Sequence, residues 1–235
     1  MKETKTNRLS ANPMRSQLFY KVFLVLAFLF GTVYRGSAQA PKNAPEPASA
    51  GTGSAESTYR GGLVSPPLPK PKFTLTDTSG APFDFLSKTE GYTTLLFFGY
   101  THCPDMCPLQ MSTIAQAIKK IPPASADRLK VVFVTTDPER DTPQVLRSWL
   151  DHFDKRFIGL TGSEAAIDAA QIAANLSPAK KSAMRADGAY EVGHAAFVLA
   201  YTKDNLAHVI YPGGVKEDDW AHDLPYLARE TWTNR

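Results

Sequence analysis

A short, uninterrupted run of apolar residues restricts the fold of this chain more than any other feature. Residues 92–100 carry Thr-Thr-Leu-Leu-Phe-Phe at their centre. A run of this length without polar alternation is typical of a strand buried on both faces, as in the middle of a parallel sheet. Residues 129–135 repeat the pattern, and residues 109–121 between them have apolar side chains at helical spacing. Strand, helix and strand in this order indicate an α/β domain.

The remaining segments extend this pattern on both sides. Residues 73–85 predict a hairpin, because an alternating stretch, a turn at 77–80 and a second short apolar piece follow one another. Later segments are predicted, in order, to form two helices, a second hairpin and a final helix: residues 141–153, 163–173, 195–211 and 218–232. The order predicts a thioredoxin-like α/β fold, with a central mixed sheet flanked by helices and an N-terminal hairpin.

The N-terminus has the three parts of an export signal. A basic stretch precedes the apolar residues 22–30, and Ala38-Gln39-Ala40 then matches a small-x-small cleavage site. The apolar run is shorter than the roughly 20 residues that cross a bilayer as a helix, and no cysteine follows it to carry a lipid. We therefore predict that residues 1–40 are a signal peptide or, as the alternative, an N-terminal membrane anchor. Either places the rest of the protein in the periplasm or at the outer face of the inner membrane.

Charge and composition separate this N-terminus from the rest of the chain. The formal net charge of the chain is +3, but six of its Lys and Arg residues lie in residues 1–40 beside a single acid. The remainder is slightly acidic, which argues against nucleic-acid binding. Residues 41–67 are rich in Ala, Pro, Gly and Ser and are predicted to be a flexible linker, because they bury too little apolar surface to fold. Residues 68–235 are then the folded domain.

The chain contains two cysteines, Cys103 and Cys107. They lie between a predicted buried strand and a predicted helix, where unpaired backbone N–H groups favour thiolates and should lower their pKa. A disulfide that closes so short a loop would restrict the unfolded chain little, so a chemical role is favoured over a structural one. Such thiolates either attack disulfides or bind soft metals, and the residues alone leave both open.

The spacing of the cysteines favours a metal. Three residues separate them, Pro104, Asp105 and Met106, which lets both sulfurs approach one ion while still permitting a disulfide. Soft sulfur ligands select Cu(I), and an added imidazole also accepts Cu(II). A structural zinc site would use four protein ligands, and the chain has no second cysteine pair.

Five histidines are candidates for a third ligand. His102 adjoins the first cysteine and is expected to face solvent, while His152 and His222 lie on predicted helices as surface residues. His208 alternates within a predicted strand and has no special context. His194 precedes a predicted strand, in a loop that a thioredoxin-like fold places against the start of the active-site helix. On the residues alone, an exposed loop histidine remains the alternative for His194.

Four separated segments carry a family resemblance: residues 98–108, 136–143, 159–162 and 190–194. In order and spacing they closely resemble the Sco (SenC) family of cytochrome c oxidase assembly proteins. The likeness runs from about residue 68 to the C-terminus. It implies a thioredoxin-like domain tethered at the outer face of an energy-transducing membrane, with one copper ion per chain. It also implies Cys103, Cys107 and His194 as the copper ligands.

The resemblance places Asp137 near the site, where it would shape the electrostatics or contact a partner. The alternative is an Asp that only caps a turn before Pro138. The chain also departs from the family, which usually has Asp before the histidine and Ser or Thr after it. Here these positions are Gly193 and Ala195. A side chain that orients the imidazole is thus expected to be absent, which would weaken copper binding or favour thiol redox chemistry.

Two functions follow from this pattern. The first is a copper metallochaperone that serves cytochrome c oxidase subunit II or a related copper acceptor, loaded by a periplasmic copper donor. The second is a thiol–disulfide oxidoreductase that reduces the acceptor's cysteines and draws on a thiol reductant. A peroxiredoxin-like peroxidase is a third interpretation, since that family also places Thr and Cys after a buried strand. Its Thr, however, stands three residues before the Cys. Here that position is Tyr100, and Thr101 is two residues before Cys103.

Overall fold

The computed structural model describes residues 58–230 and 232, so the predicted signal or anchor and residues 41–57 of the predicted linker lie outside the described residues. The strands are β1 (Gly62–Pro69), β2 (Thr74–Asp77), β3 (Pro82–Asp84), β4 (Thr93–Gly99), β5 (Leu129–Thr135), β6 (Ile158–Thr161), β7 (Lys180–Lys181), β8 (Val192–Gly193), β9 (Val198–Tyr201) and β10 (Leu206–Tyr211). The helices are α1 (Phe85–Lys88), α2 (Met106–Lys120), α3 (Pro123–Ala126), α4 (Pro143–Asp151), α5 (Glu164–Ala173) and α6 (Glu217–Arg229). In the described part of the chain, no helix is long and apolar enough to span a membrane.

Eight of these strands form one mixed sheet in the order β1-β10-β9-β4-β5-β6-β2-β3. Strands β4, β5 and β6 are parallel, and the other neighbours pair antiparallel. Every residue of β4 is buried, as the apolar run predicts for a central strand. The hairpins predicted at residues 73–85 and 195–211 are present as β2–β3 and β9–β10.

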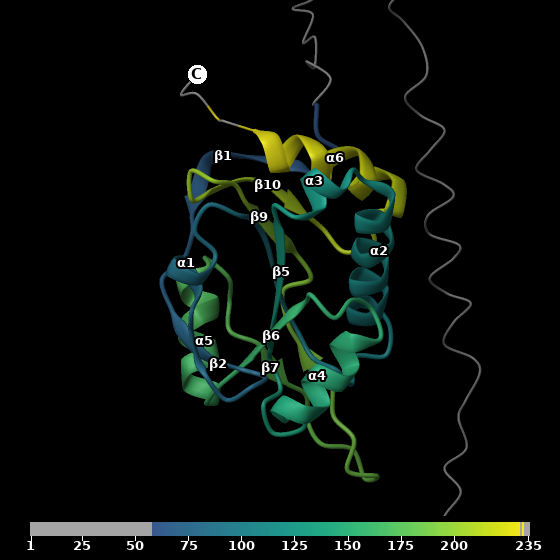
Figure 1. The fold of residues 1–235 in the computed structure, drawn as a ribbon. Coiled ribbons are helices and arrows are strands. Elements are labelled where there is room, and N and C mark those ends of the chain that lie inside the picture. The colour runs from purple at the N-terminus through teal and green to yellow at the C-terminus, as the bar shows by residue number, and fades with distance from the viewer. Residues whose placement is uncertain (1–57, 231, 233–235) are drawn as a thin grey trace, which may run out of the picture. The chain divides into compact units, whose positions relative to one another are not determined.

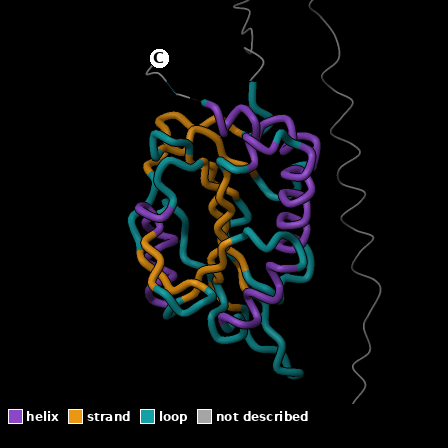
Figure 2. Tube along the Cα trace, viewed as in Figure 1, coloured by secondary structure: helices purple, strands orange, loops and turns teal. Residues whose placement is uncertain are grey.

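Alternate side chains of β4 point to opposite faces of the sheet. Leu95 and Phe97 join the apolar core beneath α2, α4 and α6, whereas Leu96 and Phe98 join the core beneath α1 and α5. Figure 1 shows these two groups of helices on the two sides of the sheet, and Figure 2 shows the strands between them. The predicted architecture, a central mixed sheet flanked by helices, is confirmed.

The folded part begins earlier than predicted. Strand β1 pairs antiparallel with β10, and the carboxylate of Asp223 in α6 accepts hydrogen bonds from the backbone N–H groups of Arg60, at 2.8 Å, and Gly61, at 3.1 Å. The expectation of a flexible linker is therefore wrong for residues 62–67. Strand β1 is held by backbone hydrogen bonds at the sheet edge while most of its side chains are exposed or half-buried, so its composition does not mark it as a strand.

The helix after the cysteine loop also begins earlier than the apolar spacing indicates. Helix α2 starts at Met106 rather than at residue 109, which places Cys107 in its first turn.

Helices α4 and α5 begin where capping residues predict them. The Thr142 hydroxyl accepts from the Val145 N–H at 3.3 Å, and Ser163 caps α5 in the same way.

Candidate metal centre

The two cysteines lie where β4 passes into α2. Cys103 is in the connecting loop and is half-buried, and Cys107 is fully buried in the first turn of the helix. The Cys107 N–H points at the Cys103 sulfur, at 3.5 Å, and both residues are free thiols. A Cβ atom at Gly99 would lie 2.9 Å from the Cys107 sulfur. The absence of a side chain at the end of β4 therefore makes room for this thiol.

The imidazole of His194 lies against these thiols. His194 directly follows β8, which pairs with β7 in a two-stranded ribbon. Its Nε2 atom is 3.4 Å from the Cys107 sulfur. The ligand atoms of Cys103, Cys107 and His194 all lie within 4.8 Å of one another. The structure thus brings together the three side chains that the sequence singled out, from segments about 90 residues apart.

Aromatic rings and a backbone carbonyl set the state of this imidazole. The rings of Phe97 and Tyr100 meet it edge-on, each with its centroid 5.8 Å away. Burial lowers the pKa of His194, so the neutral form that binds metals is favoured. Its Nδ1 atom is 3.1 Å from the carbonyl oxygen of Ala195, and a proton donated there leaves the Nε2 lone pair directed at the sulfurs. The sequence predicted that no side chain at positions 193 or 195 would orient this ring. The backbone carbonyl of Ala195 orients it instead.

The thiol of Cys107 differs from the sequence-based expectation. The start of α2 should lower its pKa, but burial raises the pKa of the Cys107 thiol far above its ordinary value. The expectation is wrong for this residue because full burial removes the water that would solvate the thiolate. A metal ion would displace the Cys107 proton on binding.

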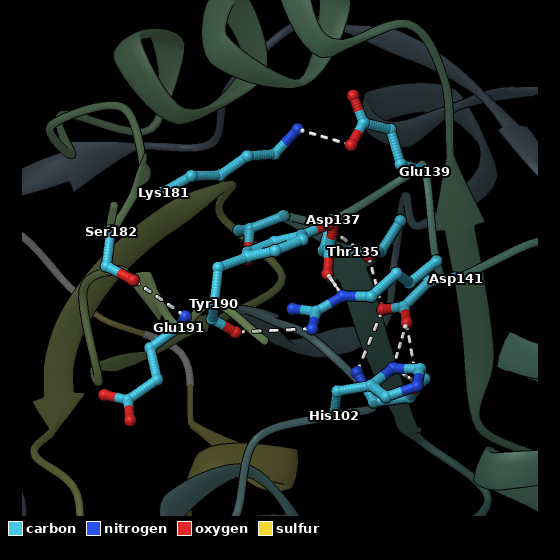
Figure 3. Close-up of polar contacts among 12 residues, drawn as sticks. His102, Thr135, Asp137, Glu139, Asp141, Lys181, Ser182, Tyr190 and Glu191 are labelled. Carbon is cyan, nitrogen blue, oxygen red and sulfur yellow. Dashed lines mark hydrogen bonds and ion pairs between the residues drawn. The ribbon is translucent and has the colours of Figure 1, made fainter. Parts of the chain in front are cut away.

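A buried carboxylate anchors the start of the cysteine loop. One oxygen of Asp141 accepts from the Thr101 N–H at 2.9 Å and from the Thr135 hydroxyl at 2.6 Å. The other oxygen accepts from the Thr101 hydroxyl at 2.6 Å. The side chain of His102 is half exposed and lies beside this carboxylate, at 3.5 Å. Figure 3 shows Asp141 with Thr135 and His102 beside it. His102 is thus turned toward Asp141 and solvent, in keeping with its predicted exposure.

Asp137 is fully buried and bonded to the segment that carries His194. One of its oxygens accepts from the Tyr190 hydroxyl at 2.8 Å (Figure 3). The other oxygen pairs with the Arg140 guanidinium. The turn that the sequence suggested is also present, because the Asp137 carbonyl accepts from the Asp141 N–H at 2.9 Å. With no exposed surface, the Asp137 side chain offers nothing for a partner to contact directly.

The other histidines lie away from this group. His208 stacks on Trp232 with ring centroids 4.0 Å apart, and His222 bonds to the carboxylate of Asp223 at 2.7 Å. His152 follows the last turn of α4. Among the residues that the structure describes, Cys103, Cys107 and His194 make up the one cluster of three or more Cys, His, Asp or Glu side chains that could hold a metal ion.

Sequence reasoning did not assign roles to Arg140, Asp141 and Tyr190. Their contacts join segments about 40 to 50 residues apart, which no local pattern reports. One signal was available: a cluster of charged residues at 137–141 directly follows a buried strand. Because neighbouring parallel strands end at the same sheet edge, that cluster had to lie beside the end of β4 and the cysteine loop.

The fold and this group of side chains define a class. A mixed sheet between helices, with two cysteines where the central strand enters a helix, is a thioredoxin-like domain, and here it carries a Cys-Cys-His candidate metal centre. Comparison of the sequence with protein families identifies the family. The model of the SCO1/SenC family matches residues 65–229, and the chain belongs to this family.

Named relatives and solved structures agree with this assignment. An SCO2-like protein of Rickettsia prowazekii is 33% identical over 132 residues, which are 56% of this chain and 63% of that relative. The solution structure of apo Sco1 from Thermus thermophilus is 33% identical with a TM-score of 0.61, over 74% of this chain and 96% of that one. Copper-bound ScoI of Bradyrhizobium japonicum is 31% identical with a TM-score of 0.58, over 68% and 99%.

Proposed function

We propose that this protein is a copper metallochaperone that holds one copper ion through Cys103, Cys107 and His194 and assists assembly of the copper centre of cytochrome c oxidase. The observation that carries the proposal is the convergence of two sulfurs and one imidazole nitrogen within 4.8 Å. Two soft sulfurs suit Cu(I), and the nitrogen adds affinity for Cu(II). The copper-bound structure of the Bradyrhizobium relative supports the choice of metal.

The number of ligands in the cluster favours copper over a structural zinc ion. Structural zinc sites close with four protein ligands, whereas this cluster offers three in the described part of the chain. Copper(I) accepts two or three ligands, so these three side chains can complete its coordination. Roles are divided accordingly: both thiolates bind the ion in either oxidation state, and His194 completes the site for Cu(II).

One side of the centre is open to an incoming ligand. Cys103 is half-buried, and His194 lines an open depression together with Leu176, Pro178 and Phe197. The Phe197 side chain is 42% exposed there. A ligand of the acceptor, such as a cysteine of oxidase subunit II, would enter at the half-buried Cys103 or along the depression beside His194 and replace one protein ligand at a time. The Sco family is described as one of cytochrome c oxidase assembly proteins, which supports this acceptor.

The location of the protein is part of the proposal. Residues 1–40 would act as a signal peptide or membrane anchor, followed by a linker and then by the folded domain. The domain would work in the periplasm or at the outer face of the inner membrane, where a copper donor loads it and a thiol reductant keeps its cysteines reduced. Mass spectrometry of the protein isolated from its host would test this layout, since cleavage after Ala40 leaves a chain that begins at Pro41.

Thiol–disulfide exchange with the acceptor is the second candidate function. It would use the same cysteines, with the half-buried Cys103 as the attacking thiol. The buried Cys107 has a raised pKa and would be a slow second nucleophile, so the geometry favours metal transport. A single protein can nevertheless use both properties in sequence on one acceptor.

A transfer assay separates the two functions. In the first mixture, copper-loaded protein meets the copper-free soluble domain of oxidase subunit II with its cysteines reduced. In the second, copper-free reduced protein meets the same domain with its cysteines as a disulfide. The metallochaperone proposal expects the acceptor's copper spectrum to develop with the reduced form. Reduction of the acceptor disulfide by the copper-free protein, without any transfer of copper in the first mixture, would instead establish the oxidoreductase.

A further inference from the structure

His194 sits on a weakly built part of the fold. The ribbon that carries it consists of two strands, β7 and β8, of two residues each. Lys180 pairs with Gly193 and Lys181 with Val192. A two-stranded ribbon is marginally stable even when it is longer than this one. Contacts from outside the ribbon must therefore fix the imidazole against the thiols.

Three side chains supply such contacts, and we call Asp137, Arg140 and Tyr190 the clasp. The Tyr190 hydroxyl donates to Asp137 at 2.8 Å, and the Arg140 guanidinium pairs with the second Asp137 oxygen. Arg140 also donates to the Tyr190 carbonyl at 3.3 Å. Its guanidinium carbon lies 3.7 Å from the centre of the Tyr190 ring, in cation–π geometry. Figure 3 shows Asp137 and Tyr190 side by side.

Burial makes the clasp a strong restraint. The Asp137 side chain is fully buried, and a buried carboxylate is stable only where its oxygens are bonded. Both of its oxygens are used here, one by Tyr190 and one by Arg140. Burial, and then the hydrogen bond to Asp137, raise the pKa of Tyr190, so the phenol keeps the proton that it donates.

The ion pairs of Lys181 in this ribbon are weak by comparison. Lys181 pairs with Glu139 at 3.1 Å and with Glu164 at 3.6 Å, but these two carboxylates are 66% and 64% exposed. Exposed ion pairs contribute little to stability, because water screens them and the side chains lose freedom. Of these two sets of contacts, the clasp is therefore the stronger restraint on the ribbon.

The clasp reaches His194 by two routes. Along the chain, Tyr190 lies two residues before β8 and His194 directly follows that strand. Through space, the Arg140 guanidinium lies 5.8 Å from the centre of the Tyr100 ring, and the same ring meets the His194 imidazole edge-on at 5.8 Å. The clasp thus limits both the path of the backbone and the position of the imidazole ring.

We propose that the clasp positions His194 and thereby sets the Cu(II) affinity of the centre, while the Cu(I) affinity depends little on it. The inference rests on the proposed function, because it assumes that copper is the metal. Two thiolates suffice for Cu(I), whereas Cu(II) gains from the imidazole nitrogen. Asp137, Arg140 and Tyr190 are positioning residues in this scheme, and none of them is a ligand.

Tyr190→Phe is the most selective test, because it removes one hydroxyl and keeps the ring under Arg140. We expect Cu(II) affinity to fall about tenfold, as is typical for residues that orient a metal ligand, with a shift in the thiolate-to-copper(II) absorption band. Cu(I) affinity should stay within about threefold. Asp137→Asn keeps an oxygen that accepts from the Tyr190 hydroxyl, so it should lose less Cu(II) affinity than Asp137→Ala. Tyr226→Phe, at a tyrosine that is 40% exposed on α6, is the matched control.

A second readout needs no copper. In metal-free Tyr190→Phe, amide hydrogen exchange should become faster in residues 190–194 and stay unchanged in α2, because only the ribbon loses a restraint. Unchanged Cu(II) affinity together with unchanged exchange would overturn the proposal. So would an equal loss of Cu(I) and Cu(II) affinity with faster exchange in α2, since that result means general destabilisation. If the wild-type protein takes up no copper, the proposed function fails, and exchange in residues 190–194 alone decides whether the clasp positions His194.

Discussion

The two sides of the metal centre are held in different ways. The cysteine side is fixed by regular structure: β4 is a fully buried strand of seven residues, and α2 is a helix of 15 residues. The histidine side is a ribbon of two-residue strands, held by polar contacts to the loop after β5. Packing of regular elements therefore sets the position of the two cysteines, whereas the position of the histidine depends on a short ribbon, its polar contacts and the rings of Phe97 and Tyr100.

This difference has a consequence for metal binding. Many apolar contacts hold the cysteines, so single substitutions outside the cluster should move them little. A ribbon of two-residue strands carries His194, with a few polar and ring contacts beside it, and regions with few buried contacts open with low free energies. We call the part that carries Cys103 and Cys107 the rigid side and the ribbon that carries His194 the adjustable side. The affinity for copper(I), which needs the sulfurs, depends on the rigid side. Copper(II), which gains from the imidazole, depends on the adjustable side.

The largest effect is expected from Cys103→Ser on the rigid side. Serine oxygen is a hard ligand, and Cu(I) then keeps one thiolate, so its affinity should fall by about a thousandfold or more. Competition with a Cu(I) chelator under anaerobic conditions measures this. Cys103 is a better choice than Cys107, because a serine hydroxyl at the fully buried position 107 would also destabilise the fold. A loss of less than tenfold would mean that Cu(I) does not depend on the pair.

His194→Ala tests the adjustable side. We expect Cu(II) affinity to fall by about a hundredfold, because a ligand is lost and not only its orientation. Cu(I) affinity should fall by less than about tenfold, and reduction of a test disulfide should proceed at the wild-type rate. His152→Ala, at the end of α4, is the control. Copper binding that survives His194→Ala unaltered would remove the histidine from the centre.

The two cysteines of the rigid side should also differ in reactivity. Cys107 is fully buried and burial raises the pKa of its thiol, whereas Cys103 is half-buried. Because the thiolate is the reactive form, iodoacetamide should modify Cys103 at least about tenfold faster than Cys107 at pH 8. Peptide mass mapping over time gives both rates, and a higher pH should narrow the gap. Equal rates at pH 8 would contradict the burial of Cys107.

The smallest effect is expected from Gly193→Asp, which restores the residue that the family usually has before the histidine. A Cβ at this position meets the Lys180 carbonyl at 3.7 Å, an ordinary contact, so the ribbon can take the side chain. A carboxylate next to the imidazole should raise Cu(II) affinity by about threefold to tenfold. Gly193→Asn has the same shape without the charge and should leave the affinity unchanged. A weaker Cu(II) site in Gly193→Asp would mean that the backbone carbonyl of Ala195 already orients the ring best.

Local patterns predicted most of the cysteine side. The unbroken apolar run indicated β4, and capping residues such as Thr142 indicated the helix starts. The environment of Cys107 was not predictable, because its burial depends on the space left by Gly99 and on side chains of other elements. Strand β1 was missed for a related reason, since its stability comes from backbone pairing with β10.

The histidine side was predicted through family resemblance and not from its own residues. Nothing in the sequence around His194 separates it from an exposed loop histidine. Its position depends on contacts such as that between Tyr190 and Asp137, which are 53 residues apart. Contacts of this kind appear only when the strand order is known, because the order brings the loop after β5 beside the ribbon.

Both sides of the centre must act together if Cys103, Cys107 and His194 hold one copper ion. X-ray absorption of the reduced protein, titrated with copper without oxygen and then oxidised, tests this most directly. We predict saturation at one copper per chain, with two sulfurs bound in both states and one nitrogen that is lost in His194→Ala. No stable uptake, or a spectrum with sulfur ligands alone in the Cu(II) state of the wild-type protein, would contradict the three-ligand centre.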